Sequence, residues 1–473
     1  MRMNKVVLIV GILLFVVLGA LLPFIRQPEV TEETKESLDL SRFYSDELSG
    51  ERAKVISQNG EALEERIRLI SQAKKRVILS TFEFDSDRSG KIMLAALAEA
   101  AQRGVEISIL VDGFPYLTSM WGNPYFLALA GMESVEIKIY SPVRPWKPWA
   151  FMGRLHDKYL IVDDVGYILG GRNTFDYFLG DQPGYKNYDW DVFVYTQESK
   201  GDSKGDRTSL NQVEEYFTSV WERPECKVMG KSFFWKINPS VKTAKKELET
   251  LYQKVEKEHS SWLETVDYKE KTLPVNHIEL ISNPTHRFAK EPVVFYTMTE
   301  LMKQAKEEVV FHTPYVICDT WMLEQLEAVC AQVDTAMMTN SVANNGNPFG
   351  AMDYQKHKGE ILDTGVEILE YDGGVSYHGK CFTMDDRISG VGSFNWDMRS
   401  AYLDTELMLV IDSVPLNQQL REEMERYERD TLEVLTESTY DLKEGQEMQK
   451  ISAKKEFRIK ALGMFAEWAR FLM

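Results

Sequence analysis

The stretch RLHDKYLIVDD, residues 154–164, places His156 and Lys158 two residues apart at the start of an apolar run. The same spacing recurs in SYHGKCFTMDD, residues 376–386. At average residue usage, one such match has odds of roughly one in a few hundred per histidine. The matched residues are His156 with His378, Lys158 with Lys380, and Asp163 with Asp385.

Both copies continue alike beyond the aspartate. A glycine stands fourteen residues after each histidine, at Gly170 and at Gly392. An asparagine stands seventeen residues after each histidine, at Asn173 and at Asn395. This longer match makes coincidence very improbable and predicts that the chain contains one structural unit twice.

The segments around the two motifs alternate between helical and strand patterns. Residues 65–85, ERIRLISQAKKRVILSTFEFD, have the pattern of a helix followed by a buried strand, and residues 299–316 repeat it. In each half, a strand containing Val-Glu-Ile precedes the histidine motif. This alternation is typical of a sheet covered by helices, so we predict an α/β fold of two similar halves.

Composition and charge set the expected boundaries. The stretch between the halves is charged and helical in pattern, and so is the stretch after the second half. The predicted regions are 1–34, an amino-terminal membrane anchor; 35–200, the first half; 201–272, a helical connector; 273–412, the second half; and 413–473, a carboxy-terminal helical segment.

The predicted anchor is an uncharged run from Val6 to Ile25. Twenty residues can cross a bilayer as one helix. Arg2 and Lys5 precede the run, whereas acids soon outweigh Arg26 after it, which favours a cytoplasmic amino terminus with the catalytic body outside the cell membrane. A cleaved signal peptide is the alternative, but the run exceeds the usual length of its apolar region.

The overall composition argues against two kinds of function. A formal net charge of -18 disfavours a broad surface for polyanions, so nucleic acid is not an expected partner. The four cysteines have no spacing typical of metal ligands, so neither a zinc site nor a disulfide framework is predicted.

The repeated motif suggests chemistry on an anion. Residues i and i+2 of a strand share one side, so each histidine should project together with its lysine. A buried cation beside a histidine needs an anion nearby, and two facing motifs would surround one phosphodiester. One imidazole would attack phosphorus while the other donates a proton, without a metal or cofactor. The alternative is a pair of structural core histidines.

The two motifs resemble the paired signatures of the phospholipase D superfamily from about Glu61 to Ile411, outside the connector. GGRN and GSFNWDMRS are most similar to bacterial cardiolipin synthases. The resemblance implies α/β sandwich halves related by a pseudo-twofold axis and transfer through a phosphohistidine. It implies that His156 is the nucleophile and His378 the general acid and base, and that Asp163 and Asp385 act mainly in support.

Further residues are expected around this site. Asn173 and Asn395 would hold phosphate oxygens, together with the lysines. The loops GGRN and GSFN differ at Arg172 and Ser393, which we assign to substrate contact in each half. An imidazole also needs an acid on its other nitrogen. Glu406 matches the supporting acid of the family, and we assign Asp191 as its counterpart in the first half, with a surface ion pair as the alternative.

Two segments have the composition of membrane contacts. The loop SPVRPWKPWAFMGR, residues 141–154, interleaves cations with aromatic rings, as suits a lipid interface. Residues 454–473 combine apolar residues at helical spacing with basic residues, as suits an anionic membrane surface. For both segments, packing on the body of the protein is the alternative.

Three functions are compatible with these features. The first is a phosphatidyltransferase that makes cardiolipin, with phosphatidylglycerol as the expected substrate. The second is a hydrolase of the same superfamily, either a phospholipase or a nuclease. The third is a membrane-tethered binding protein without activity. The intact motif pair argues against the third, and the acidic body argues against a nuclease. The sequence does not predict the oligomeric state.

Overall fold

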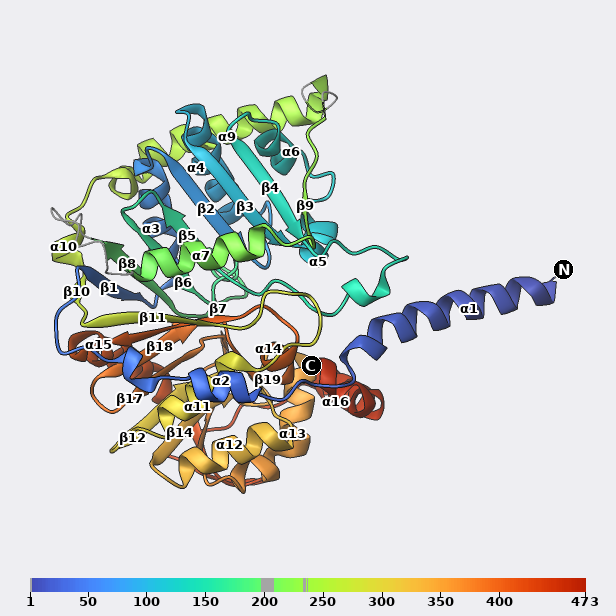
Figure 1. Cartoon of the computed structure of the whole chain (residues 1–473), viewed down its shortest axis with the longest axis vertical. Helices are drawn as coiled ribbons and strands as arrows, with labels where there is room; N and C mark the ends of the chain where they lie inside the picture. The colour runs from blue at the N-terminus through green and yellow to red at the C-terminus, as the bar shows by residue number, and fades with distance from the viewer. Residues whose placement is uncertain (1, 197–207, 233–234, 236) are drawn as a thin grey trace.

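The computed structural model describes residues 2–473 except 197–207, 233–234 and 236. Helix α1, Arg2–Leu21, continues into the short helix η1, Leu22–Phe24, and projects away from the body (Figure 1). Its apolar stretch Val7–Phe24 is long enough to cross a membrane. The prediction of one candidate transmembrane helix before the α/β body is therefore confirmed.

The first half is built on a nine-stranded sheet with the order β10-β1-β8-β6-β5-β2-β3-β4-β9. Strands β2, β3 and β4 run parallel, and the other neighbours are antiparallel. The strands are β1 Glu51–Ile56, β2 Arg76–Thr81, β3 Glu106–Asp112, β4 Val135–Tyr140, β5 Tyr159–Val162, β6 Gly166–Gly170, β8 Asp191–Thr196, β9 Cys226–Val228 and β10 Leu273–Pro274.

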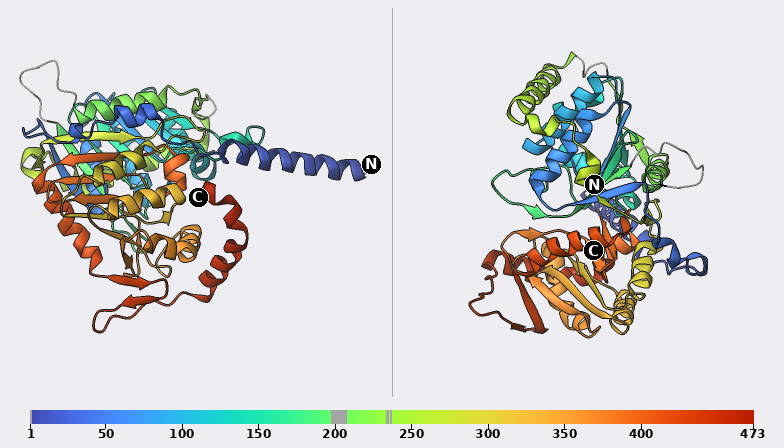
Figure 2. Two further views of the ribbon diagram at one scale, coloured as in Figure 1. Left: turned by 60° about the horizontal axis from the view of Figure 1, so that its bottom comes forward. Right: turned by 90° about the vertical axis from the view of Figure 1, so that its left-hand side faces the viewer.

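The second half repeats this topology in the order β11-β20-β18-β17-β12-β14-β15-β21-β22. Strand β17 follows the second histidine motif as β5 follows the first, and both lie at the same place in their sheets. The strands are β11 His277–Ser282, β12 Glu308–His312, β14 Asp334–Asn340, β15 Glu367–Tyr371, β17 Cys381–Met384, β18 Ile388–Gly392, β20 Leu407–Asp412, β21 Thr431–Thr436 and β22 Thr439–Asp441. Two similar α/β halves are thus confirmed (Figure 2).

Helices and the opposite sheet cover the apolar faces. A central core contains side chains of both sheets and of helices α7 and α15, so the two halves pack through their inner faces. Separate outer cores join each sheet to its own helices. The helices are α3 Asn59–Gln72, α4 Arg88–Gln102, α6 Pro124–Ala130, α7 Ser209–Trp221 and α9 Pro239–Glu258 in the first half, and α11 Val293–Met302, α12 Thr320–Cys330, α13 Pro348–Leu362 and α15 Val414–Glu428 in the second.

The expected connector and tail are largely integrated into these halves. Within residues 201–272, the described part supplies α7, the edge strand β9, and α9, which packs on α4 and α6. Beyond residue 412, α15 joins the central core, and β21 and β22 extend the second sheet. The final helices, α16 Ala453–Ala466 and η6 Glu467–Leu472, follow, and α16 packs against α13.

Two short backbone pairings connect the halves. Strand β7, Asn187–Tyr188, runs parallel to β16, Ser376–Tyr377. A parallel bridge joins Leu155 to Thr405. Each pairing lies immediately before a motif histidine and therefore fixes that histidine against the opposite half.

Candidate active site

The two motif histidines line one cavity of about 500 Å³, together with Asn173 and Asn395. His156 and His378 precede β5 and β17, respectively, rather than lying within strands as the sequence suggests. Each histidine directly follows a residue that pairs with the opposite half, Leu155 or Tyr377, and its ring lines the cavity. The two halves thus contribute matching residues to a single site.

Each histidine is held by an acid from the opposite half. Nδ1 of His156 lies 2.8 Å from Oε1 of Glu406, and Nδ1 of His378 lies 2.6 Å from Oδ2 of Asp189. The side chains of both acids are fully buried, whereas those of His156 and His378 are 14% and 12% exposed, respectively. A carboxylate on Nδ1 favours the Nδ1–H tautomer, which leaves Nε2 with a free electron pair.

The assignment of Asp191 as the first-half acid is wrong, because Asp189 occupies that place. Asp191 instead accepts hydrogen bonds from Arg66, at 2.9 Å, and from Arg172, at 3.1 Å, in the interior. These ion pairs are buried, so the surface alternative is also excluded.

Strand register could have identified the correct acid. Gly170 pairs with Asp191 across β6 and β8, as Gly392 pairs with Met408 across β18 and β20. Because the two glycines are equivalent, the residue two before Asp191 is equivalent to Glu406. The loop after Asn173 is longer than its counterpart, and this difference hides the match in the sequence.

Ser393 positions an acid and does not line the cavity. Its hydroxyl donates to Oε2 of Glu406, and the hydroxyl of Ser400 donates to Oε1 at 2.7 Å. The equivalent residue in the first half is Gly171, where an added Cβ would lie 2.2 Å from Oδ1 of Asp189. The acid pocket of the first half therefore has no room for a serine.

Arg172 also does not bind substrate, contrary to the prediction. Its guanidinium is fully buried and donates to the carbonyl oxygens of Ile56 and Ser57, at 3.0 and 2.8 Å, as well as to Asp191. This group ties the loop after β6 to the end of β1. The side chain that reaches the cavity from this loop is that of Asn173.

The motif lysines lie behind the histidines. Nζ of Lys158 donates to the carbonyl oxygen of His156 at 2.5 Å. Nζ of Lys380 donates to the carbonyl oxygen of His378 and lies 2.5 Å from its Nδ1 and 3.6 Å from Asp189. Both are fully buried, and neither is among the described residues that line the cavity. Direct contact of these lysines with phosphate remains a prediction.

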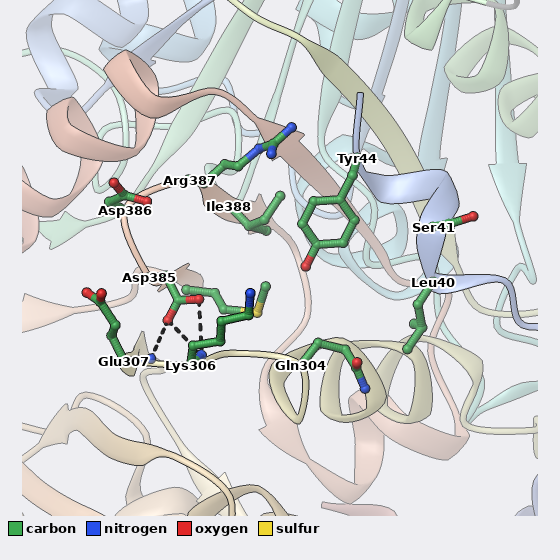
Figure 3. Close-up of a pocket in the computed structure, with 11 residues that line it drawn as sticks. Leu40, Ser41, Tyr44, Gln304, Lys306, Glu307, Asp385, Asp386, Arg387 and Ile388 are labelled. Atoms are coloured by element: carbon green, nitrogen blue, oxygen red, sulfur yellow. Dashed lines mark hydrogen bonds between the residues drawn. The ribbon is translucent and has the colours of Figure 1, made fainter. Parts of the chain in front are cut away.

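The motif aspartates support the turns at the far ends of β5 and β17. Asp163 accepts from the backbone N–H groups of residues 74–76, each at 2.8 Å. Figure 3 shows the carboxylate of Asp385 directed at the backbone N–H groups of Lys306 and Glu307, beside a different cavity. Both have φ of +49°. Both aspartates thus hold backbone turns away from the cavity, which agrees with the supporting role that the resemblance implies.

Burial and the lysines set the charge states of the site. Burial, followed by Lys158, holds the pKa of His156 well below its usual range. Burial, followed by Lys380, lowers the pKa of His378 to about 3. Both rings are thus neutral at neutral pH, and the charge of a bound anion would favour their protonation.

The two acids differ in charge. Burial raises the pKa of Glu406 to about 7. For Asp189, burial opposes ionisation, but Lys380 and the hydrogen bond from His378 outweigh it and lower the pKa. The first-half acid is therefore ionised at neutral pH, whereas the second-half acid is close to its midpoint.

Sequence reasoning missed most of the cavity wall. Phe82 contacts His156 edge to face, and Phe178, which lines a neighbouring cavity, contacts His378 in the same way. Arg399 is the only arginine or lysine among the described lining residues, and it is paired with Asp404 at 2.9 Å. The remaining lining residues are Tyr315, Ile317, Asn347, Phe349, Asp397, Ser400, Ala469, Leu472 and Met473.

Comparison with known proteins agrees with this geometry. A family model described as "Cardiolipin synthase, PLD-like domain" matches residues 67–221 and 298–427. The chain belongs to this family. It is 26% identical to a cardiolipin synthase of Clostridium perfringens (strain SM101 / Type A), over 76% of this chain and 67% of the relative. It is 23% identical to cardiolipin synthase C of Escherichia coli (strain K12), over 76% of this chain and 80% of the relative.

The fold of this phospholipase D-like family member is also that of a solved structure. The phosphatidylserine synthase of Haemophilus influenzae Rd KW20 superposes with a TM-score of 0.63 at 15% sequence identity. The match covers 93% of this chain and 98% of that protein. Both halves and their relative placement are therefore shared with that fold.

Proposed function

We propose that this chain is a phosphatidyltransferase of the cardiolipin synthase type, which transfers a phosphatidyl group from one phosphatidylglycerol to a hydroxyl of another. The observation that carries the proposal is the pair of histidines at one cavity, each with a buried acid on Nδ1. The family and the similarity to two cardiolipin synthases support the substrate class.

In the first step, Nε2 of His156 attacks phosphorus and the bond from phosphorus to the glycerol oxygen breaks. Binding of the anionic diester favours a proton on His378, which ionised Asp189 stabilises, and this proton passes to the departing glycerol oxygen. The product is a phosphohistidine. Asn173 and Asn395 line the cavity where the non-bridging oxygens would lie.

In the second step, the acceptor hydroxyl gives its proton to Nε2 of His378 and attacks phosphorus. The bond from phosphorus to His156 breaks, which releases cardiolipin, leaves His156 neutral and leaves His378 with the proton that the next leaving group needs. Two phosphatidylglycerol molecules thus give one cardiolipin and one glycerol, and no metal or cofactor takes part in the balance.

A second cavity favours transfer to an alcohol over transfer to water. It has a volume of about 760 Å³ and shares Asn173, Tyr315, Asn347 and His378 with the first cavity. An acceptor entering there reaches the proposed general base without displacing the donor lipid. We therefore favour the transferase over the phospholipase.

For the orientation, we propose that the catalytic body lies outside the cell membrane. Arg2 and Lys5 on the amino-terminal side of α1 support this placement. Attachment of a membrane-impermeant amine or thiol label to the body in intact cells would confirm it, and protection of the body until lysis would contradict it.

The activity test is incubation of the purified full chain with labelled phosphatidylglycerol in mixed micelles. We expect cardiolipin and glycerol in equal amounts, no product from His156→Gln, and normal product from the matched control His277→Gln. Phosphatidic acid as the main product would establish a hydrolase, and no turnover of phosphatidylglycerol would contradict the proposed substrate.

A further inference from the structure

The loop of residues 144–151 presents an exposed tryptophan between two cations. Trp146 is 64% exposed, and Lys147 is also exposed. Neither Arg144 nor Lys147 has an acidic partner within the described part of the chain. An indole ring beside unpaired cations, on a chain of net charge -18, has the chemistry of an anionic lipid interface rather than of a water-exposed turn.

This loop lies against α1 at a depth within its apolar span. An added Cβ at Gly19 would lie 2.5 Å from Cγ of Pro148, so the helix and the loop are in direct contact and only a glycine permits it. Gly19 stands five residues before Phe24, the last residue of the apolar stretch. At the rise of these helices, that distance is about 8 Å. If α1 crosses a membrane, the contact with the loop lies about 8 Å inside the end of the span, next to the interface.

The final helical segment lies beside the same loop and forms one wall of the catalytic cavity. Arg399 donates to the carbonyl oxygen of Met152 at 2.6 Å and to that of Leu472 at 3.2 Å, and so links the loop to residues 468–473. Leu472 and Met473 line the cavity, and Trp468 is 61% exposed. Figures 1 and 2 show this segment near the base of α1.

We propose that residues 144–151 and 468–473 form a membrane-binding rim that seats the mouth of the catalytic cavity on an anionic bilayer. The apolar wall formed by Ile317, Phe349, Leu472 and Met473 then faces the lipid and receives the acyl part of the donor. Membrane binding by the rim is independent of the reaction catalysed, whereas the role of the wall rests on the proposed function.

The first test is quenching of tryptophan fluorescence by lipids that carry a nitroxide near the headgroup. The full chain is reconstituted in vesicles of phosphatidylglycerol and phosphatidylcholine. We expect Trp146→Phe to remove a quenched component of the emission. The matched control is Trp262→Phe in the short helix Ser260–Leu263, which follows α9 and packs on α3 and α9 of the first half. Equal quenching in the wild type and Trp146→Phe would overturn the proposal.

The second test separates the rim from the chemistry. The double substitution Arg144→Glu and Lys147→Glu should lower turnover of phosphatidylglycerol in vesicles by roughly tenfold or more, since each reversal replaces attraction to the surface by repulsion. Turnover of a monomeric short-chain phosphatidylglycerol should not change. Equal loss on both substrates would overturn the rim as a membrane contact. Absence of turnover on both by the wild type would contradict the proposed function, while the quenching result would stand.

Discussion

The two histidine pockets have the same plan but different charge. His156 contacts Glu406, which two serine hydroxyls hold and whose pKa burial raises to about 7. His378 contacts Asp189, which the backbone N–H of Trp190 holds and whose pKa lies below its usual value. An ionised acid stabilises an imidazolium, whereas a neutral acid does not. The difference favours His378 as the proton donor and His156 as the neutral nucleophile.

The largest expected contrast is between the histidines themselves. His156→Gln should abolish turnover and covalent labelling, because no other group attacks phosphorus. His378→Gln should slow turnover by roughly a hundredfold or more, the contribution of general acid catalysis. A phosphatidyl ester of p-nitrophenol, whose leaving group needs no proton, should restore much of the loss in His378→Gln only. Rescue and labelling of His156→Gln instead would reverse the two roles.

The next largest difference in turnover should be between substitutions of the two acids, Asp189 and Glu406. Asp189→Asn removes the charge that stabilises protonated His378, so turnover should fall by roughly a hundredfold at all pH values. Glu406→Gln reproduces the protonated form of Glu406 and should remain within about threefold of the wild type at pH 6. Rate measurements between pH 5.5 and 8.5 would check this, and a larger loss for Glu406→Gln at pH 6 would show that Glu406 acts as a carboxylate.

The raised pKa of Glu406 also predicts how the stability of the folded protein changes with pH. The folded state binds its proton more tightly than the unfolded state, so the stabilisation is fully present below the unfolded pKa near 4.5 and is lost as pH rises through about 7. Urea unfolding at pH 5 and pH 8 should therefore show a larger loss of stability with pH for the wild type than for Glu406→Gln. Equal losses would place the folded pKa of Glu406 near its ordinary value.

A smaller effect should follow from exchanging the residues beside the acids. Gly171→Ser places a Cβ against Asp189 and should reduce turnover by roughly tenfold and stability by about 1–3 kcal/mol. Ser393→Gly removes one hydroxyl from Glu406 and should reduce turnover less. Kinetics and thermal unfolding of both variants would test this order. The opposite order would mean that losing a hydroxyl hydrogen bond to Glu406 harms the site more than crowding the carboxylate of Asp189 does.

The motif aspartates should affect stability alone. Asp163→Ala loses three backbone hydrogen bonds of 2.8 Å and puts alanine at a positive φ, so we expect about 2–4 kcal/mol of destabilisation. Asp385→Ala should lose less, because its bonds are longer, and Asp163→Asn should recover part of the loss. Turnover per folded molecule, measured beside urea unfolding, should not change in any of them.

The sequence predicts the features that both halves repeat and misses those that differ between them. The histidines, asparagines and alternating strands recur at fixed spacing, so two halves and one shared site follow from the chain alone. Asp189 was missed because the loop that precedes it is longer than the loop that precedes Glu406, so the two acids do not share a spacing. Arg172 was misassigned because its neighbour Asn173 faces the cavity while Arg172 faces the interior.

The expected connector shows the same limit at a larger scale. Its charged, helical pattern predicts a connector between the halves but not its packing: Leu248, Tyr252 and Val255 of α9 are buried in the first-half core. Their spacing of four and three residues is that of one helix face, and this was the available signal. Net composition conceals such a face when charged residues fill the remaining positions.

Because Leu155 pairs with Thr405 and Tyr188 pairs with Tyr377, each half supplies the acid that contacts the histidine of the other half. Neither half carries a complete histidine and acid pair, so a fragment containing one motif has to meet another copy before it holds an oriented imidazole. The two halves are therefore constrained to change together. A substitution beside Thr405 alters the histidine of the first half, and one beside Tyr188 alters the histidine of the second.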